Sequence, residues 1–481
     1  MPFDVYSQAG ADAKFLTEVD GGDLDAAPLP ITLRRGTTAE RDASNPILAA
    51  GEPAVVLDSG QPAELVLGDG VTAMADLPIV GDLTPARPSV NTLGVLGDSI
   101  TDFGTASGTT FDSRNAKGYW VWALIRLRHR LRLITEAGVA GNTTAQMLDR
   151  LDSYLANGTP GWNLVLGGTN DAAGLVDLAT ITANLTAIYD RIADSGGRVV
   201  AVTVPPKTGA SSAQNLRIAE VNRWIKQQGG TRPGLVVCDV YPALVAATSG
   251  DYAAGMSADG THPAPQGASV MGKIVADTLT PLIPALDVLP YGAVDTANLI
   301  TNPLLTGTGG TVGTGGTGSV ATGWQVHPDQ GVASVFACSK VARTDGIAGE
   351  WQQVVVTSGQ VKANFNVSGF GTTYNTGDRV YAVCEFETDA DLAAATGNWF
   401  RLKLVATKPD FGDGFAGYDL DNNVDTAWPA ATFVPRAGVF VTPVITVPST
   451  ATLRLAFELQ RKGAGTIRVS RAGIYREGTG P

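Results

Sequence analysis

Short hydrophobic runs and stretches with helical spacing of apolar residues alternate through the middle of the chain. The runs read as buried strands: Leu93–Leu96, Leu131–Ile134, Leu164–Leu166, Val199–Val204 and Leu235–Val237. The helical stretches cover about 117–130, 143–156, 176–195, 211–228 and 265–283. This order predicts an α/β domain over residues 86–285, with a parallel sheet and helices on both of its faces.

The patterns at the two ends of the chain are different. After residue 286 apolar and polar positions alternate with a period of two, which predicts a β-sandwich or jelly roll over 286–481. Within it, the Gly/Thr-rich stretch 306–319 predicts a loop. Residues 1–85 predict a small β-rich module of short strands joined by turns, followed by a proline-containing linker over 82–90.

Composition narrows the classes of partner. The formal net charge of −12 argues against nucleic acid, because phosphate binding needs a basic face. The sequence has no apolar stretch of membrane-spanning length and no signal-peptide pattern at its start, so we expect neither membrane insertion nor standard export. The three cysteines are too far apart to indicate a metal site or a disulfide framework.

Ser99 is the candidate nucleophile, because it follows the first buried strand, where open α/β sheets place their chemistry. Of the three histidines, His129 lies among arginines on what we predict to be a solvated helix face, and His327 lies in the C-terminal β region. His262 follows the last strand of the α/β domain, and Asp259 precedes it by three residues. We therefore predict His262 as the base and Asp259 as the group that orients it.

Two further strand ends offer donors for an oxyanion. Asn170 follows one strand and can present its side-chain amide, and Gly141 follows another and can present its backbone N–H. The backbone N–H of Ser99 would be a third donor. For Gly141 a plain turn, and for Asn170 a loop-stabilising side chain, remain alternatives.

Other polar and aromatic residues near these strand ends have simpler interpretations. Asp98 and Asp171 lie beside turns and are predicted to be caps, so no metal or other cofactor is implied. Trp120, Trp122 and Trp162 are predicted core or rim aromatics, with substrate contact by Tyr119 and Trp120 as a minor alternative. The polar stretch 107–114 is a candidate loop that shapes the acyl pocket.

The order of these blocks matches a known pattern. Gly97-Asp98-Ser99-Ile100-Thr101, Gly141, Gly168-Thr169-Asn170-Asp171 and Asp259-Gly260-Thr261-His262 together resemble the SGNH (GDSL-type) hydrolases over about residues 91–282. The resemblance implies a three-layer α/β/α fold on a five-stranded, flavodoxin-like parallel sheet. It also implies ester hydrolysis with Ser99, His262 and Asp259 as the triad and with Ser99, Gly141 and Asn170 as the oxyanion hole.

Two more resemblances concern the ends of the chain. Arg34-Arg35-Gly36-Thr37-Thr38-Ala39-Glu40, Asn45-Pro46-Ile47-Leu48 and Leu67-Gly68-Asp69-Gly70 resemble the attachment module near the start of bacteriophage tail-fibre and tail-spike proteins. Asn298-Leu299-Ile300-Thr301-Asn302-Pro303-Leu304 resembles the start of jelly-roll modules on phage tail proteins and glycan-active enzymes. Carbohydrate binding is therefore one hypothesis for the C-terminal domain.

Together the resemblances predict a homotrimeric phage tail protein of the virion that acts outside the cell. Its middle domain would remove O-acetyl groups from a bacterial surface polysaccharide, and its first module would bind other tail proteins. Two alternatives stay open. One is a receptor-binding adhesin whose esterase domain is weak or vestigial, and the other is a bacterial carbohydrate acetylesterase with a binding module.

Overall fold

The chain forms two compact units in the computed structural model, Met1–Pro88 and Ser89–Pro481. The predicted linker at 83–90 lies outside the described residues. The three-domain division with a boundary near 286 stays a prediction, because the second unit contains both the α/β and the C-terminal β parts. The structure describes residues 34–36, 39, 47–50, 52–56, 64–68, 70–74, 79–82, 91–107, 112–156, 158–292, 295–329, 331–368, 372–389, 399–407, 413–421, 435–447 and 454–478.

The first unit is β-rich, as predicted. Its four-stranded sheet has the order β1-β2-β3-β4, with β1 parallel to β2 and the other pairs antiparallel. Leu48, Ala54, Val66 and Met74 form a small buried cluster beside it. The strands are β1 (Arg34–Gly36), β2 (Pro53–Val56), β3 (Glu64–Leu67) and β4 (Ile79–Asp82).

The α/β region is built on a five-stranded parallel sheet with the order β11-β10-β9-β5-β8. This flavodoxin-like order confirms the predicted fold class. The first strand along the chain, β5, is an interior strand between β9 and β8 and is fully buried, as expected when helices cover both faces of a parallel sheet. The strands are β5 (Thr92–Gly97), β8 (Arg132–Gly138), β9 (Trp162–Leu166), β10 (Arg198–Val202) and β11 (Leu235–Cys238).

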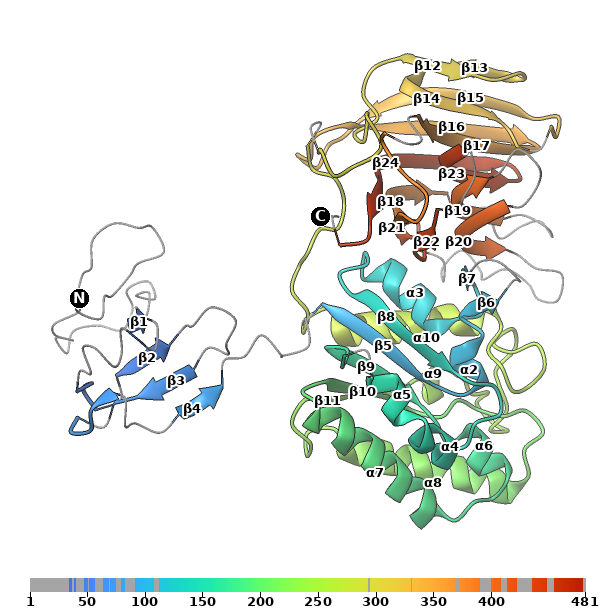
Figure 1. The fold of residues 1–481 in the computed structure, drawn as a ribbon. Helices are drawn as coiled ribbons and strands as arrows, with labels where there is room; N and C mark the ends of the chain where they lie inside the picture. Colours follow the sequence, from blue (N-terminus) through green and yellow to red (C-terminus); the bar gives the residue numbers. More distant parts are fainter. Residues whose placement is uncertain are drawn as a thin grey trace, which may run out of the picture. The chain divides into compact units, whose positions relative to one another are not determined.

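Helices cover both faces of this sheet (Figure 1). One hydrophobic cluster joins the sheet to α3 and α10, and a second joins it to α4, α5, α7 and α8. α3 is apolar on every side because it packs against α10 on one flank and against the C-terminal strand β21 on another. The helices are α2 (Ser99–Asp102), α3 (Tyr119–Arg126), α4 (Thr144–Asp149), α5 (Leu151–Leu155), α6 (Thr169–Ala173), α7 (Leu178–Asp194), α8 (Ser212–Gln228), α9 (Tyr241–Leu244) and α10 (Pro265–Leu279).

The C-terminal region is β-rich, as predicted, and its two sheets share one hydrophobic core. Its assignment as a jelly roll stays a prediction. The first sheet contains β12 (Gly309–Val312), β14 (Val320–Pro328), β17 (Gln360–Val367), β23 (Arg454–Lys462), β19 (Trp399–Thr407) and β20 (Asp413–Asp421). The second contains β13 (Gly316–Gly318), β15 (Val335–Ala342), β16 (Glu350–Ser358), β24 (Gly465–Arg476), β18 (Arg379–Thr388), β21 (Ala437–Val441) and β22 (Ile445–Thr446).

Two sequence predictions are wrong here. The Gly/Thr-rich stretch 306–319 is not only a loop, since β12 and β13 lie within it and pair with β14 and β15. Strand pairing at a sheet edge needs only backbone groups, so a stretch without core side chains can still take part. The stretch 107–114 is likewise not simply a loop, because β6 (Thr105–Ser107) and β7 (Asp112–Asn115) pair as an antiparallel hairpin.

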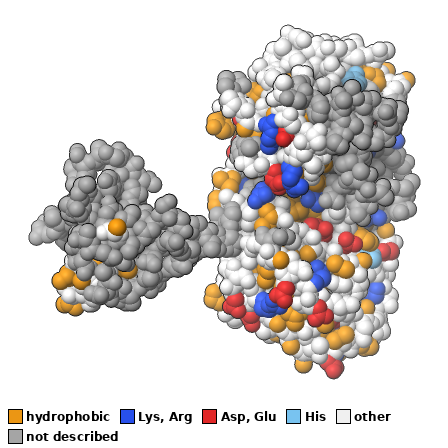
Figure 2. Space-filling model, viewed as in Figure 1, with side chains coloured by type: hydrophobic (Ala, Val, Ile, Leu, Met, Phe, Trp, Pro, Cys, Tyr) orange, Lys and Arg blue, Asp and Glu red, His pale blue; other side chains and the backbone are white. Residues whose placement is uncertain are grey.

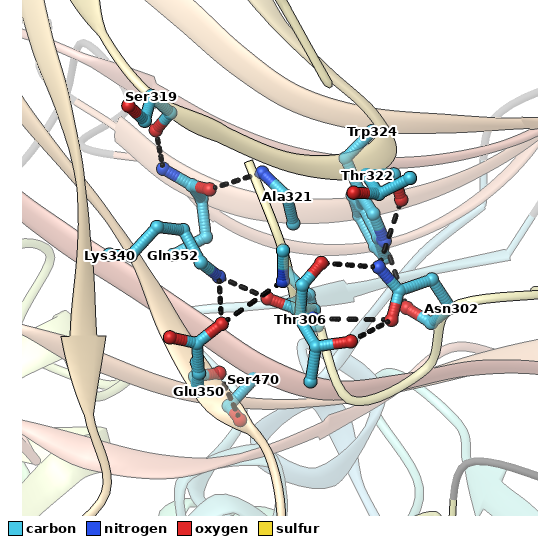
Figure 3. Close-up of polar contacts among 12 residues, drawn as sticks. Asn302, Thr306, Ser319, Ala321, Thr322, Trp324, Lys340, Glu350, Gln352 and Ser470 are labelled. Atoms are coloured by element: carbon cyan, nitrogen blue, oxygen red, sulfur yellow. Dashed lines mark hydrogen bonds and ion pairs between the residues drawn. The ribbon is translucent and has the colours of Figure 1, made fainter. Parts of the chain in front are cut away.

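A network of polar contacts fixes the start of the C-terminal region (Figure 3). The side-chain amide of Asn302 donates to the carbonyls of Thr306 and Thr322, each at 2.9 Å. Its oxygen accepts from the backbone N–H of Thr306 at 3.1 Å. Trp324 Nε1 donates to the Asn302 carbonyl at 2.9 Å. The Asn302 side chain thus holds the loop before β12 against β14.

The surface carries charges of both signs. Acidic and basic side chains are interspersed on the face drawn in Figure 2. Some are ion-paired, as are Lys273 and Asp277 on α10. No helix among the described residues has the length and apolar character needed to span a membrane.

The β6–β7 hairpin ties the α/β region to the C-terminal region. β7 pairs in parallel with β20, so the hairpin forms the end of an eight-stranded sheet whose other strands all come from the C-terminal region. The hairpin follows α2 directly along the chain. The segment after Ser99 is therefore built into the C-terminal sheet.

A buried carboxylate, Glu385 on β18, lies at the same junction. It accepts hydrogen bonds from Arg128 of the α/β region at 2.5 Å, from Arg343 at 2.8 Å and from Arg471 at 2.9 Å. Arg471 also pairs with Asp287, which follows α10. Burial by itself would raise the pKa of Glu385, but hydrogen bonds from the three guanidinium groups outweigh it and hold the pKa below its usual range.

We predict that Glu385→Gln lowers the free energy of unfolding at pH 7 by about 3 kcal/mol, because it removes the buried counter-charge that Arg343 and Arg471 share. The folded-state pKa of Glu385 is depressed, so its contribution is present above the unfolded pKa and is lost as the pH falls through the folded pKa. The difference in unfolding free energy between Glu385→Gln and wild type should therefore become smaller at acidic pH. Denaturant unfolding at several pH values measures this difference.

The matched control is Glu220→Gln, which removes a partly exposed pair with Arg217 on α8. We expect it to change the unfolding free energy by less than about 1 kcal/mol. Equal effects of the two substitutions at pH 7 would contradict a stabilising role for Glu385.

Candidate active site

Ser99 lies at the turn where β5 ends and α2 begins. Asp98 is the N-cap of α2, and its Oδ1 accepts the backbone N–H of Ile100 at 2.9 Å. Gly138, at the end of β8, packs so closely on α2 that an added Cβ would lie 2.2 Å from the Asp102 nitrogen. The cap and this close packing fix the turn that presents Ser99.

The structure brings Ser99, His262 and Asp259 together. His262 Nε2 lies 2.8 Å from Ser99 Oγ, and His262 Nδ1 lies 2.6 Å from Asp259 Oδ2. Because an ionised carboxylate only accepts hydrogen bonds, Nδ1 carries the proton and Nε2 accepts from the Ser99 hydroxyl. This is the arrangement that a nucleophile, a base and an orienting group require.

The loop that carries His262 is held mainly by its own polar groups. Asp259 Oδ1 accepts the backbone N–H groups of Thr261 at 2.8 Å and of His262 at 2.7 Å. Ser257 Oγ donates to the His262 carbonyl at 2.6 Å. Burial tends to raise the pKa of Asp259, but its hydrogen bonds from His262 and Thr261 lower the pKa well below its usual range. Asp259 therefore stays ionised opposite the imidazole.

The constellation is open to solvent on one side. The side chain of Asp259 is 53 % exposed and that of His262 is 22 % exposed. Phe103 covers part of the imidazole, with ring centroids 4.3 Å apart. The sequence reasoning missed Phe103, although an aromatic residue four positions after Ser99 lies one helical turn from it.

The candidate oxyanion donors Gly141 and Asn170 follow β8 and β9, at the same carboxyl edge of the sheet as Ser99. Gly141 has φ of +80°, a conformation that favours glycine. Asn170 Nδ2 donates to the Asn142 carbonyl at 2.9 Å, and a primary amide has a second N–H to offer. Their roles as donors stay predictions.

The predicted cap Asp98 is confirmed, whereas Asp171 lies within α6, whose N-cap is Gly168. Asp98 caps α2, as described above. Asp171 accepts hydrogen bonds from the Thr144 backbone N–H at 2.9 Å and from the Thr144 hydroxyl at 2.7 Å, at the start of α4.

The sequence did not point to Arg150, whose guanidinium donates to the Asn142 side chain and to the Gly97 carbonyl, each at 2.7 Å. Within the described part of the chain, no three His, Cys, Asp or Glu residues are grouped so that they could hold a metal ion.

Two other side-chain predictions need correction. His129 is not on a solvated helix face: it is buried just after α3, and burial lowers its pKa to about 3. Tyr119 and Trp120 are fully buried in the core, which excludes the alternative that they contact substrate directly. The core interpretation of Trp120, Trp122 and Trp162 is confirmed.

Comparison with known families agrees with this architecture. Residues 95–270 match the GDSL-like lipase/acylhydrolase family. The chain contains a GDSL-like acylhydrolase domain. Residues 31–72 match the N-terminal domain of the major tropism determinant. The acylhydrolase domain therefore follows a module of a phage tropism protein in the same chain. No curated protein matches the chain.

Solved structures similar to the acylhydrolase domain include a GDSL-like lipase from Bacteroides thetaiotaomicron, at 17% identity and a TM-score of 0.34 over 41% of this chain and 92% of that one. They also include a catalytic mutant of Axe2, an acetylxylan esterase from Geobacillus stearothermophilus, at 20% identity and a TM-score of 0.33 over 40% of this chain and 95% of that one.

We predict that Asp98→Asn stabilises the protein at pH 7. Burial raises the pKa of Asp98 to about 6, so its ionised form is unfavourable in the folded state. Because the folded pKa lies above the unfolded one, stability falls as the pH rises between the two values. An amide avoids this loss and should add about 2 kcal/mol to the unfolding free energy at pH 7 and little at pH 4.

Denaturant unfolding at both pH values measures this effect. Asp171→Asn is the contrasting control, because Asp171 uses both oxygens as acceptors and should lose stability when one becomes a donor. A destabilised Asp98→Asn protein at pH 7 would contradict the prediction.

Proposed function

We propose that the chain is a phage tail-associated serine esterase that removes O-acetyl groups from a bacterial surface polysaccharide. The observation that carries the proposal is the pair of short contacts that joins Ser99 to His262 and His262 to Asp259. They lie within an acylhydrolase domain that follows a phage tropism module.

The proposed reaction has two halves. Ser99 Oγ attacks the ester carbonyl while its proton passes to His262 Nε2, and Asp259 stabilises the resulting imidazolium. The ester C–O bond then breaks, the proton on Nε2 passes to the leaving sugar hydroxyl, and the acetyl group remains on Ser99. Water then attacks the acetyl-serine and gives its proton to Nε2. The bond between the acyl carbon and Ser99 Oγ breaks, the proton on Nε2 returns to Ser99 Oγ, and acetic acid leaves and ionises to acetate.

Donors around Ser99 stabilise the oxyanion of each tetrahedral intermediate. The proposed donors are the backbone N–H groups of Ser99 and Gly141 and the side-chain amide of Asn170. The contact between Asn170 and the Asn142 carbonyl supports this role, because it fixes the amide before substrate arrives. The reaction uses no cofactor.

The exposure of the site favours a polysaccharide ester over a lipid. Over half of the Asp259 side chain and about a fifth of the His262 side chain are exposed. A long acyl chain binds best in an enclosed apolar pocket, whereas an acetyl group on a glycan needs only a small one and leaves the bulky polymer in solvent.

We also propose roles for the two flanking parts of the chain and an oligomeric state. The first module attaches the chain to other tail proteins of the virion, the C-terminal β region binds glycan or supports assembly, and the protein is a homotrimer.

The tropism-determinant match also favours a second candidate, a receptor-binding adhesin whose esterase domain is weak. The two candidates differ in whether bound polysaccharide loses acetate.

Ser99→Ala tests the esterase. Full-length protein and the variant would be incubated with p-nitrophenyl acetate, and we expect the variant to lose about 10⁴-fold in turnover, as in other triad deletions. Ser195→Ala, an exposed serine after α7, is the matched control and should keep wild-type turnover. Equal rates for wild type and Ser99→Ala would exclude the proposed nucleophile.

Acetate release tests the substrate. We expect wild-type protein to release acetate from at least one member of a panel of O-acetylated capsules and O-antigens, and Ser99→Ala to bind the same polymer without release. Enzymatic acetate assay and a pull-down on immobilised polysaccharide measure the two properties. Wild-type binding without acetate release would favour the adhesin.

A further inference from the structure

A cavity of about 280 Å3 lies in the α/β region between the edge strand β8 and the β6–β7 hairpin. One wall is Leu133, Ile134, Thr135 and Glu136, four successive residues of β8. The other is Thr105 of β6 and Arg114 of β7. Neither the acylhydrolase match nor the proposed reaction assigns it a role.

The helix that begins with Ser99 packs on the strand that forms one wall of the cavity. β6 begins shortly after α2 ends, and the close packing of Gly138 on Asp102 puts the end of β8 against the same helix. Glu136 Oε1 accepts the Gly138 backbone N–H at 3.0 Å, so the acid of the cavity is fixed to this end of the strand. A group bound here would therefore lie along β8, the strand on which α2 packs.

The lining is rich in hydrogen-bonding groups of both kinds. Arg114 Nη1 donates to Thr105 Oγ1 at 3.3 Å. Glu136 and Thr135 add acceptors and a hydroxyl. Within the described residues β8 pairs only with β5, so its outer edge also offers backbone N–H and C=O groups.

This chemistry selects the class of ligand. An acyl chain in the cavity would remove water from an acid, a guanidinium and hydroxyls without replacing the lost hydrogen bonds, which is costly. A sugar ring carries hydroxyl groups that donate and accept, and so satisfies both kinds of lining group. The volume is slightly below the ~300–1,000 Å3 of small-molecule sites, which suits one sugar unit rather than a chain.

The C-terminal region holds one wall of the cavity in place. β7 pairs with β20 in a register that sets Arg114 opposite Tyr418. The position of the Arg114 backbone therefore depends on the C-terminal sheet, while Glu136 belongs to the α/β sheet.

We propose that this cavity is a binding subsite for a hydroxyl-rich sugar unit of the same polysaccharide whose ester Ser99 attacks. The inference rests on the proposed esterase function and extends it to the recognition of a saccharide. The C-terminal region then contributes to substrate choice by holding the Arg114 wall.

Two near-isosteric variants of the full chain test the subsite, Thr135→Val and Glu136→Gln. Their probes are chemically O-acetylated xylotriose and cellotriose, with p-nitrophenyl acetate as a substrate that has no sugar. For the better trisaccharide we expect each variant to raise KM about tenfold, the effect of one or two lost hydrogen bonds, with kcat within about twofold of wild type. Both kinetic constants for p-nitrophenyl acetate should be unchanged.

Matched controls are Thr182→Val on α7 and Glu220→Gln on α8. These two helices cover the face of the sheet that is opposite to α3 and α10. Both should behave as wild type on every substrate. Thermal unfolding of each variant would show whether it is folded at the assay temperature.

Three outcomes would overturn the subsite. The variants could raise KM equally for the trisaccharide and for p-nitrophenyl acetate, or raise it for neither. Wild-type protein could also show a KM for both trisaccharides that is no lower than its KM for p-nitrophenyl acetate. Failure of the esterase proposal is distinct, because it appears as p-nitrophenyl acetate hydrolysis that Ser99→Ala does not change.

Discussion

The hydrogen bond between Ser99 Oγ and His262 Nε2 spans 163 residues of sequence, and the arrangement of the α/β region makes it possible. In a parallel sheet the carboxyl ends of all strands meet at one edge. Ser99 follows the interior strand β5, and His262 follows the last strand β11 and the short helix α9. Any change that displaced β5 or the turn after it would separate the two side chains.

The turn itself combines opposing effects. Asp98 caps α2 and so helps to present Ser99, yet it is fully buried and its pKa is raised to about 6. Asp259 is more exposed and strongly hydrogen-bonded, so its carboxylate is favoured. The pKa of Asp98 is thus raised because the carboxyl group is buried away from water, whereas the pKa of Asp259 is lowered because its carboxylate accepts several hydrogen bonds.

The C-terminal region is more than an appended module. It takes the β6–β7 hairpin into its own sheet, packs β21 on α3 and surrounds Glu385 with arginines from both regions. Through the hairpin it also holds one wall of the cavity along β8. The contacts that join the two regions of the second unit therefore also hold the hairpin that lines this cavity.

The sequence by itself determined the α/β fold, because the strand and helix periods of residues 91–283 are local properties. It also pointed to Ser99, Asp259 and His262, since His262 is the only histidine that follows the last strand within the α/β domain. Tertiary structure decided what depends on distant partners. The hairpin at 105–115 joins a sheet whose other strands begin two hundred residues later, His129 is buried by packing that its local arginines do not indicate, and Phe103 meets His262 only in the fold.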